Sequence, residues 1–261
     1  MHASSNPATD HHYADLVCVA RVHDYLRGGN HNFSFDRDYA DAHPDAAQVV
    51  RKILSREQEF LNRAVQFMLD QGITQFLNLG SGLPARGTVL DTVVRLYPEA
   101  QVVHVDTDPA VVEHGRLIAG ERTHFLQADA TCLSQVLIPP ITAGTLKLHK
   151  PIGVLAVGLA HLLPESERAL TFLPSYGETL AHGSALAATH LTPWFGGRFT
   201  PAAAQLIAGP CGSLHPRRRR KVAQLFTGFE LVAPGLIADT SMLTGLALKP
   251  SKSDTERRLR E

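Results

Sequence analysis

The feature that most constrains this sequence is a regular alternation of short apolar runs with amphipathic stretches, which begins at Ile73. The apolar runs are TQFLNLG, QVVHVD, THFLQAD, PIGVLAVG and SALAATHL, and the stretches between them include TVLDTVVRLYP, PAVVEHGRLIAG and ESERALTFLPSYGETL. Strands that alternate with helices at this spacing run parallel, with right-handed crossovers. The sequence therefore predicts an α/β domain with a doubly wound, Rossmann-like sheet.

The last two apolar runs follow a different pattern. FELVAPG and TSMLTGLALKP are separated by a turn at Pro234 and Gly235, with no helix between them. Strands joined by a short turn pair antiparallel. We therefore expect a mostly parallel sheet of seven strands with an antiparallel hairpin at its edge, an ending that an ordinary dinucleotide-binding sheet lacks.

The segment before the sheet is predicted to be helical. From Ala46 to Gln71 apolar residues recur at helical spacing, and Gly72 follows as a left-handed stop. Much of the opposite face of this helix is charged, through Arg51, Lys52, Arg56, Glu57 and Arg63. We divide the chain into a disordered leader at 1–12, a helical lid at 13–72, the principal domain at 73–250 and a charged tail at 251–261.

Composition narrows the class of protein. The 261 residues contain 25 Lys and Arg against 25 Asp and Glu, so no broad positive field is available for nucleic acid or an anionic membrane. The three cysteines lie far apart without a CxxC pair, which argues against a disulfide framework or a zinc knuckle. The same cysteine spacing gives no sign of a metal site. Because no signal peptide or membrane-spanning run is evident, we expect a cytoplasmic protein.

Three successive strand ends carry groups that can hold a ligand. Gly80 and Gly82 in LNLGSGLPARG allow a sharp turn and close approach to main chain, although with Gly87 they do not give the strict GxGxxG spacing. Asp106 ends the second strand, where a carboxylate can accept hydrogen bonds from both hydroxyls of a ribose, and Asp129 follows the third strand. Since open parallel sheets bind ligands at this edge, the coincidence predicts a ligand site there.

Each turn also has a purely structural interpretation. The glycines fit any tight turn between a strand and a helix. Asp108 before Pro109 is typical of a helix start, and Asp129 is equally suited to capping the next helix.

The ends of the fourth and fifth strands offer candidates for chemistry. Gly158 and His161 follow the fourth strand, and His161 is the first candidate for proton removal or substrate orientation, although a lone histidine is more often structural. The fifth strand ends in ATHLTPW, which contains His190 and Trp194. Trp194 fits an apolar acceptor pocket and core packing equally well.

Together these motifs resemble one family. The stretch ARVHDYLRGGNHNFSFDR is similar to the signature Arg-x-x-Asp-Tyr-x-x-Gly-Gly-x-x-Asn-Phe, and LGSGLPARG, VDTDP, QADAT, GLAHLLP, ATH and FTGFELVAPGLI match later blocks in order. The resemblance spans roughly Ala20 to Pro250. It is to the S-adenosyl methyltransferase family, once catalogued only as a domain of unknown function, and it implies a class I methyltransferase fold with S-adenosylmethionine as cofactor.

The resemblance also implies residue roles. Asp106 would take the ribose hydroxyls, and Asp129 with Ala130 would border adenine. The expected cofactor contacts are Arg21, Gly80, Ser81, Gly82, Leu83, Asp106, Thr107, Asp129, Ala130 and Gly158.

We expect the N-terminal signature to form a lid over cofactor and acceptor. Arg21 would pair with the methionine carboxylate. His161 is the first candidate for the catalytic base, and Tyr25 and His190 are the next candidates. The expected acceptor contacts are Asn32, Phe33, His190 and Trp194.

Two positions depart from the family pattern. Asn78 stands where an acidic residue is usual, so anchoring of the cofactor's ammonium is expected to be weaker or indirect. Leu90 stands where a histidine is common, which implies different chemistry or another acceptor.

The expected reaction is in-line methyl transfer to a small-molecule acceptor, for which a secondary metabolite is the best guess. An NAD-dependent dehydrogenase would share the glycine loop and Asp106, but not the loop spacing or the antiparallel ending. A non-catalytic module that binds S-adenosylmethionine or S-adenosylhomocysteine is compatible with Asn78 and Leu90. A nucleic-acid methyltransferase would need the run Arg217–Lys221 to face the site, whereas such runs are more often a solvated helix start.

Overall fold

The computed structural model describes residues 16–84, 88–193, 200–239 and 241–250. The expected leader at 1–12, the expected tail at 251–261 and Trp194 lie outside the described residues. All the helices and strands named below fall within these ranges.

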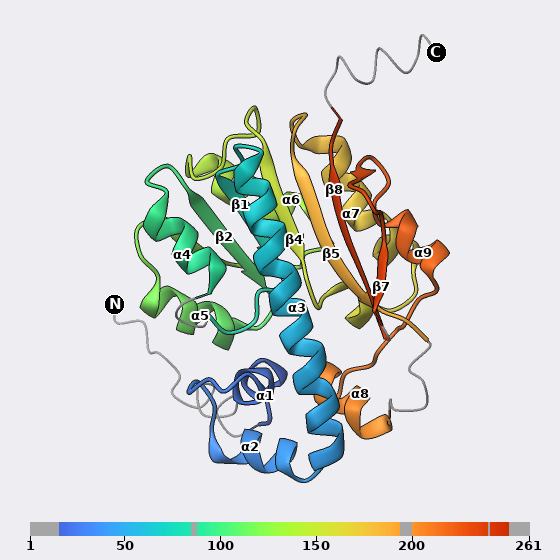
Figure 1. Ribbon diagram of the computed structural model, residues 1–261. Helices are drawn as coiled ribbons and strands as arrows, with labels where there is room; N and C mark the ends of the chain where they lie inside the picture. Colours follow the sequence, from blue (N-terminus) through green and yellow to red (C-terminus); the bar gives the residue numbers. More distant parts are fainter. Residues whose placement is uncertain (1–15, 85–87, 194–199, 240, 251–261) are drawn as a thin grey trace, which may run out of the picture.

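One sheet organises the molecule (Figure 1). Its strands follow the order β3-β2-β1-β4-β5-β8-β6, and β7 also pairs with β8. The first five strands are parallel, and β8 is antiparallel to its neighbours. The strands are β1 (Gln75–Leu79), β2 (Gln101–Asp106), β3 (Thr123–Gln127), β4 (Ile152–Ala156), β5 (Ala185–Leu191), β6 (Glu230–Leu231), β7 (Ile237–Asp239) and β8 (Met242–Leu248). The predicted mostly parallel sheet with an antiparallel ending is confirmed.

The antiparallel ending differs in detail from a simple edge hairpin. Strand β8 lies inside the sheet, paired with β5 from Ala185↔Leu248 to Leu191↔Met242. The run FELV contributes only the two residues of β6, and β7 was not predicted. Strand β8 is apolar and most of it is buried, as is typical of a strand in the interior of a sheet.

Helices cover both faces of the sheet. Apolar residues of α3 and α4 pack on one face, and those of α6 and α7 pack on the other (Figure 1). The helices are α1 (Val19–Leu26), α2 (Ser34–Asp41), α3 (Pro44–Asp70), α4 (Val89–Leu96), α5 (Pro109–Ile118), α6 (Leu133–Thr142), α7 (Glu167–Thr179), α8 (Pro201–Ala208) and α9 (Arg219–Gln224), with a 3₁₀ turn, η1, at Ala160–Leu162.

Local sequence explains where the main helices begin and end. Pro44 opens α3 at its first turn, and Gly72 ends it with φ of +76°, as predicted. Helix α6 contains two prolines and nevertheless continues to Thr142. It does so because Pro139 and Pro140 lie in its last turn, where their carbonyls still accept hydrogen bonds from the chain that follows.

The helices α1, α2 and α8 form a separate layer beyond the carboxyl ends of the parallel strands (Figure 1). They share an apolar cluster with the first half of α3, to which Val50, Ile53 and Leu206 belong. The second half of α3 packs on the sheet through residues such as Val65 and Met68. Helix α3 therefore joins the sheet to the layer that covers its carboxyl edge. No helix in the described part of the chain is long and apolar enough to cross a membrane.

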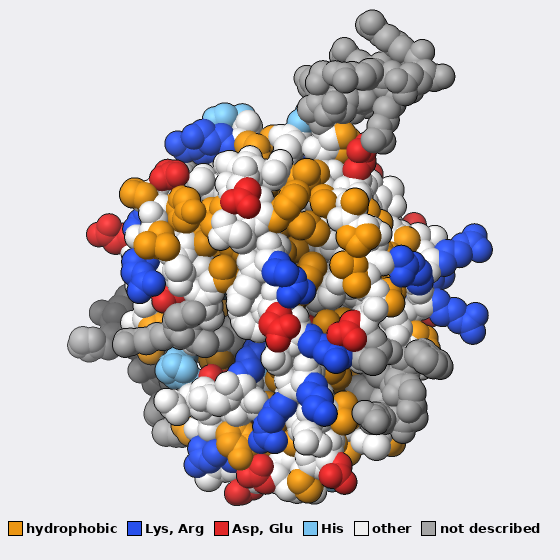
Figure 2. Space-filling model, viewed as in Figure 1, with side chains coloured by type: hydrophobic (Ala, Val, Ile, Leu, Met, Phe, Trp, Pro, Cys, Tyr) orange, Lys and Arg blue, Asp and Glu red, His pale blue; other side chains and the backbone are white. Residues whose placement is uncertain are grey.

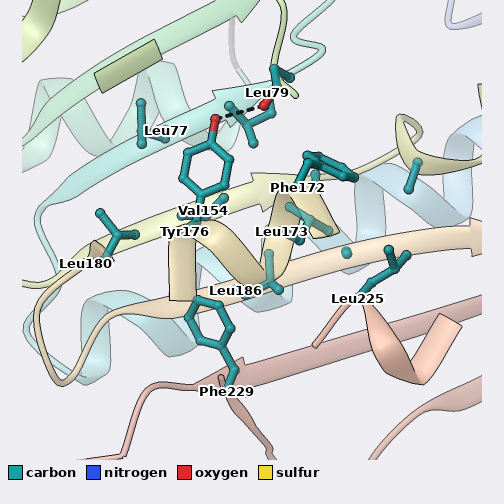
Figure 3. Packing of buried hydrophobic residues seen from close by; sticks show 14 of the residues in the cluster. Leu77, Leu79, Val154, Phe172, Leu173, Tyr176, Leu180, Leu186, Leu225 and Phe229 are labelled. Carbon is teal, nitrogen blue, oxygen red and sulfur yellow. Dashed lines mark hydrogen bonds between the residues drawn. The ribbon is translucent and has the colours of Figure 1, made fainter. Parts of the chain in front are cut away.

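The largest apolar cluster lies between the sheet and α7. Leu173, Tyr176 and Leu186 are fully buried there, and Figure 3 shows them packed together with Leu77 and Val154. The Tyr176 hydroxyl donates a hydrogen bond of 3.0 Å to the backbone oxygen of Ala130. This bond ties α7 to the turn that follows β3, so core packing also fixes part of the carboxyl edge.

Replacement of Leu173 tests this core. Leu173 is completely buried, whereas Leu117 on α5 is 84% exposed. We expect Leu173→Ala to lower the free energy of unfolding by roughly 2–5 kcal/mol, because it leaves a cavity in a close-packed layer. Leu117→Ala is the matched control and should change it by less than about 0.5 kcal/mol in urea titrations followed by circular dichroism. Equal effects of the two substitutions would contradict the packing described.

Candidate active site

A cavity of about 880 Å³ lies at the carboxyl edge of the sheet. Turns after β1, β2, β3 and β4 form its floor, and side chains of α1, α3 and α8 form the opposite wall. Such a volume falls within the range of roughly 300–1,000 Å³ that is usual for ligand sites. Of the sequence-predicted site residues, those that line it are Gly80, Ser81, Gly82, Leu83, Asp106, Thr107, Asp129, Ala130, Gly158 and His161.

The turn after β1 is bound to the end of β2. The backbone N–H groups of Gly80 and Ser81 both donate to the oxygen of Val105, at 2.8 and 3.1 Å. Gly80 and Gly82 have φ of +64° and +62°, a left-handed conformation that favours glycine. A Cβ on Gly80 would lie 2.8 Å from Leu159, whereas one on Gly82 would meet nothing within 4 Å. Gly82 therefore presents bare main chain to the cavity.

Asp106 holds the same turn from its side chain. Its carboxylate accepts hydrogen bonds from the N–H groups of Gly82 at 2.9 Å and Asp108 at 3.0 Å. Burial raises the pKa of Asp106, and these backbone bonds oppose the rise. Asp108 accepts from Ala110 N–H at 2.9 Å, which confirms that Asp108 caps α5.

Asp129 is fixed in a turn of its own. Its Oδ1 accepts hydrogen bonds from the Thr131 N–H and hydroxyl at 2.8 and 2.7 Å, and its Oδ2 pairs with Arg168 at 2.8 Å. Burial raises the pKa of Asp129. The Thr131 hydrogen bonds and the Arg168 charge lower it by more than burial raises it, so the net shift of the pKa is downward. Asp129 does not cap α6, whose N-cap residue is Cys132. A partly exposed, ionised carboxylate therefore borders the cavity beside β3.

His161 is the one predicted catalytic residue that lines the cavity. It is 1% exposed, and its Nδ1 has no hydrogen-bond partner among the described residues. Burial lowers its pKa well below the ordinary value, and His190, His23 and Arg217 add to the effect. His161 is therefore a neutral imidazole on the cavity wall near pH 7.

His190 is a correction to the expected acceptor contacts, because it does not line the cavity. Its Nδ1 donates to the oxygen of Leu191 at 2.7 Å, and its Nε2 accepts from Arg217 at 2.9 Å. Both ring nitrogens are thus occupied inside the protein. His190 supports the wall behind His161, whose ring centroid lies 5.9 Å away.

The basic run Arg217–Lys221 was interpreted as a solvated helix start, but its first residue, Arg217, is buried. It is 4% exposed and donates to the backbone oxygens of Ala160 and Leu163 at 2.7 and 2.8 Å. The helix itself begins only at Arg219. Arg217 therefore fastens the η1 turn that carries His161, and only the rest of the run remains for the surface.

The most distinctive residues of the N-terminal signature form a turn, and the cavity contacts of this stretch come instead from Ala20, His23 and Arg27. Asp24 accepts hydrogen bonds from the His31 N–H at 2.7 Å and the Asn32 side chain at 2.8 Å. A Cβ on Gly29 would lie 2.0 Å from an Asp24 oxygen, which explains the need for glycine there. The sequence pattern therefore reports a local fold.

Four signature residues that were expected at the cofactor or the acceptor do not line the principal cavity: Arg21, Tyr25, Asn32 and Phe33. Arg21 pairs with Asp36 at 2.7 Å, with its guanidinium 5.0 Å from the Phe33 ring centroid. Arg21, Asn32 and Phe33 line a smaller cavity of about 300 Å³ and not the principal one. The Tyr25 hydroxyl donates to Asp41 at 2.9 Å and does not line the principal cavity either. None of these side chains can serve there as the base or the carboxylate anchor without rearrangement.

Glu57 was predicted to lie on the charged, exposed face of α3, but the structure buries it in the cavity wall. Glu57 is 3% exposed and lines the cavity together with Ile53, Leu54 and Leu61 of the same helix. Burial raises its pKa to about 7, against the Arg27 charge and the Thr189 hydrogen bond. Only its spacing of four residues from Ile53 and Leu61 could have signalled this position.

The two departures from the family pattern have distinct surroundings. The Asn78 amide donates to Nδ1 of His104 at 3.1 Å, and His104 stacks on Phe125 with ring centroids 4.5 Å apart. Burial lowers the pKa of His104 to about 4, so this imidazole accepts the bond in its neutral form. Leu90 is 2% exposed within the apolar cluster under α4, where a charged group would be unfavourable.

A parallel sheet with an antiparallel inserted strand, a glycine turn after β1 and a carboxylate at the end of β2 are features of the class I methyltransferase fold. The family model of the S-adenosyl methyltransferases matches residues 7–258, and the chain belongs to that family. The protein is thus an S-adenosylmethionine-dependent methyltransferase, and the expected fold, cofactor and family are confirmed.

Solved structures agree with this assignment. A DUF574 family protein from Streptomyces avermitilis is 26% identical with a TM-score of 0.80, over 90% of this chain and 98% of its own. A putative methyltransferase from Thermobifida fusca is 29% identical with a TM-score of 0.78, over 95% and 100%. Magnesium protoporphyrin IX methyltransferase from Synechocystis, solved with bound S-adenosylhomocysteine, shares the fold at 13% identity and a TM-score of 0.53, over 87% and 93%. No curated protein gave a significant sequence match.

The cavity residues fit the adenosyl cofactor. A side chain at Gly82 would project into the space that a ligand needs, and the neighbouring Asp106 offers a carboxylate for ribose hydroxyls. Asp129 and Ala130 border the cavity next along the edge. The roles that the family resemblance implies for these positions remain predictions.

The buried histidines of the site lead to a pH prediction. Burial lowers the pKa of His104 and His190 to about 4 each, so both should stay neutral in ¹⁵N NMR spectra down to about pH 5. In urea-unfolded protein, the control, they should titrate near about 6.5. Because the unfolded chain then binds more protons, these two groups lower the free energy of unfolding as pH falls from about 6.5 towards 4. Protonation of either ring near pH 6.5 in the folded protein would contradict the buried positions.

Proposed function

We propose that the protein methylates a small organic molecule, of the kind found among secondary metabolites, inside this cavity. The observation that carries the proposal is the continuity of the site. One cavity contains both the turns suited to the cofactor and a wall formed by His161 and Leu162. Helix α1 and the first half of α3 cover it, which supports their proposed role as the lid and favours a compact acceptor over a polymer.

The bound cofactor supplies a methyl group on a positively charged sulfur, which is a strong electrophile. The protein's part is then to exclude water and to hold the acceptor atom in line with that methyl group. Ile53, Leu54, Leu162 and Ile207 give the cavity an apolar wall for this purpose. An oxygen or nitrogen acceptor also has to lose a proton.

His161 is the residue we propose to receive or orient that proton. It is neutral and lines the cavity, so its imidazole can accept a hydrogen bond from an acceptor group. The carbonyl bonds of Arg217 hold the backbone on both sides of His161. A rigid support of this kind favours precise placement of the ring.

Two alternatives receive less support. Binding of nucleic acid is not favoured, because Arg217 is buried and cannot contact a phosphate backbone. Figure 2 also shows positive and negative side chains interspersed along α3 on the face that it displays. A non-catalytic cofactor-binding role leaves unexplained why the cavity extends past the cofactor turns to His161. The cytoplasmic location remains a prediction from the sequence.

Calorimetry with S-adenosylhomocysteine and with NAD tests the cofactor site. We expect binding of the first compound and none of the second. Asp106→Asn should weaken S-adenosylhomocysteine binding by roughly 10- to 150-fold, since bonds to a charged group contribute about 1.5–3 kcal/mol. Asp70→Asn, at the exposed far end of α3, is the control and should bind like the wild type. Preference for NAD would refute the proposed function.

Replacement of His161 tests the chemistry. Using radiolabelled cofactor and small molecules extracted from the source cells, we expect His161→Ala to reduce methyl transfer about 100-fold or more, the usual contribution of a positioned proton acceptor. The dissociation constant for S-adenosylhomocysteine should stay within about twofold, because the ring is assigned to the acceptor side. The exposed His149→Ala is the control. Unchanged transfer by His161→Ala would remove His161 from the mechanism.

A further inference from the structure

Two opposite charges face the principal cavity without meeting each other. Glu57 lies on α3, and Arg27 lies at the C-terminal end of α1, followed by Gly28 with φ of +80°. They are close enough for the Arg27 charge to affect the pKa of Glu57, yet no ion pair within 4.0 Å joins them among the described residues. The cavity is therefore lined by an acidic and a basic group that are not paired with each other among the described residues.

The Glu57 carboxyl group is incompletely satisfied. Its Oε1 accepts one hydrogen bond of 3.2 Å from the Thr189 hydroxyl, which in turn accepts from the Gly158 N–H at 2.8 Å. Its Oε2 accepts none from the described residues, and it would lie 3.2 Å from a Cβ on Gly158. Buried carboxylates are costly unless they are paired, so this group is poised to receive a cation.

The guanidinium of Arg27 is similarly available. Among the residues that the structure describes, its side-chain nitrogens make no hydrogen bond and no ion pair. Asp24 and Glu57 are the acidic groups whose charges act on it, and Asp24 is already engaged by the His31 N–H and the Asn32 amide. Arginine binds carboxylates through two parallel hydrogen bonds, so an anionic ligand group would complete its bonding.

The position of the pair along the sheet edge suits one end of the cofactor. Glu57 contacts the end of β4 and β5, whereas Asp106 ends β2, and β1 lies between β2 and β4. Two strand spacings amount to roughly 10 Å. That separation is of the order of the distance from the ribose to the α-amino acid group in an adenosyl thioether of this kind.

We propose that Glu57 and Arg27 together bind the α-amino acid end of the cofactor, Glu57 taking the ammonium and Arg27 the carboxylate. The inference rests on the proposed cofactor site. It assigns binding of the cofactor's carboxylate to Arg27, because Arg21 is already paired with Asp36. It also provides the acidic group that the first strand lacks at Asn78.

Two ligands that differ only at this end test the inference by calorimetry. S-adenosylhomocysteine carries the amino acid, and 5′-methylthioadenosine has the same nucleoside and thioether without it. We expect Glu57→Gln and Arg27→Gln each to weaken S-adenosylhomocysteine binding at least tenfold and to leave 5′-methylthioadenosine within about twofold. The matched controls are Glu59→Gln and Arg63→Gln, exposed residues of α3, which should bind both ligands like the wild type.

Proton release gives a second measurement that needs no variant. Burial raises the pKa of Glu57 to about 7, so an arriving ammonium ionises the protonated fraction. At pH 7, calorimetry in two buffers of different ionisation enthalpy should show release of about half a proton with S-adenosylhomocysteine and none with 5′-methylthioadenosine. The other titratable groups that face the cavity near Glu57 stay constant there, because Arg27 remains protonated and burial keeps His23, His104 and His161 neutral.

The outcomes separate the inference from the function on which it rests. If wild-type protein binds both ligands but Glu57→Gln binds S-adenosylhomocysteine unchanged, or weakens both ligands equally, the assignment of Glu57 is overturned. Equal proton release with the two ligands overturns it as well. A wild-type protein that binds neither ligand overturns the proposed function and this inference together.

Discussion

The packing of α3 against the sheet is the interaction on which the site depends. Its second half is buried on the face of β1 and β4, while its first half extends past the carboxyl edge and supports α1 and α8. A helix that did only the first would leave the glycine turn open to solvent. Because one rigid helix does both, Glu57 is held at a fixed depth in the cavity, four residues from Ile53 and four from Leu61.

The five parallel strands and the turns that follow them were predictable because each carries its own local signal. Gly80, Gly82 and Asp106 sit where strand periodicity ends, so sequence position alone located them at one edge of the sheet. The polar residues of helices gave no comparable signal. Glu57 and Arg217 belong to charged stretches, and whether such a side chain faces water or a cavity is decided by tertiary packing that composition does not record.

The N-terminal signature shows a related limit. Its residues form an unusual pattern, which invited a ligand-binding interpretation, yet Asp24, Gly29 and Asn32 are used to build the turn between α1 and α2. Their effect on the cavity is indirect. By fixing the end of α1, that turn decides where Arg27 points, so a pattern can be functional without any of its most distinctive members lining the site.

The electrostatics of the cavity depend on which titratable groups burial keeps neutral. The imidazoles of His23, His104 and His161 are neutral near pH 7 because burial lowers the pKa of each. The ionic character of the walls is therefore left to acidic residues and to Arg27 and Arg95. A cofactor with two positive groups and one negative group at its amino acid end matches that balance. Burial thus favours such a ligand before any direct contact is considered, because a neutral or anionic nucleoside would leave Glu57 without a cation.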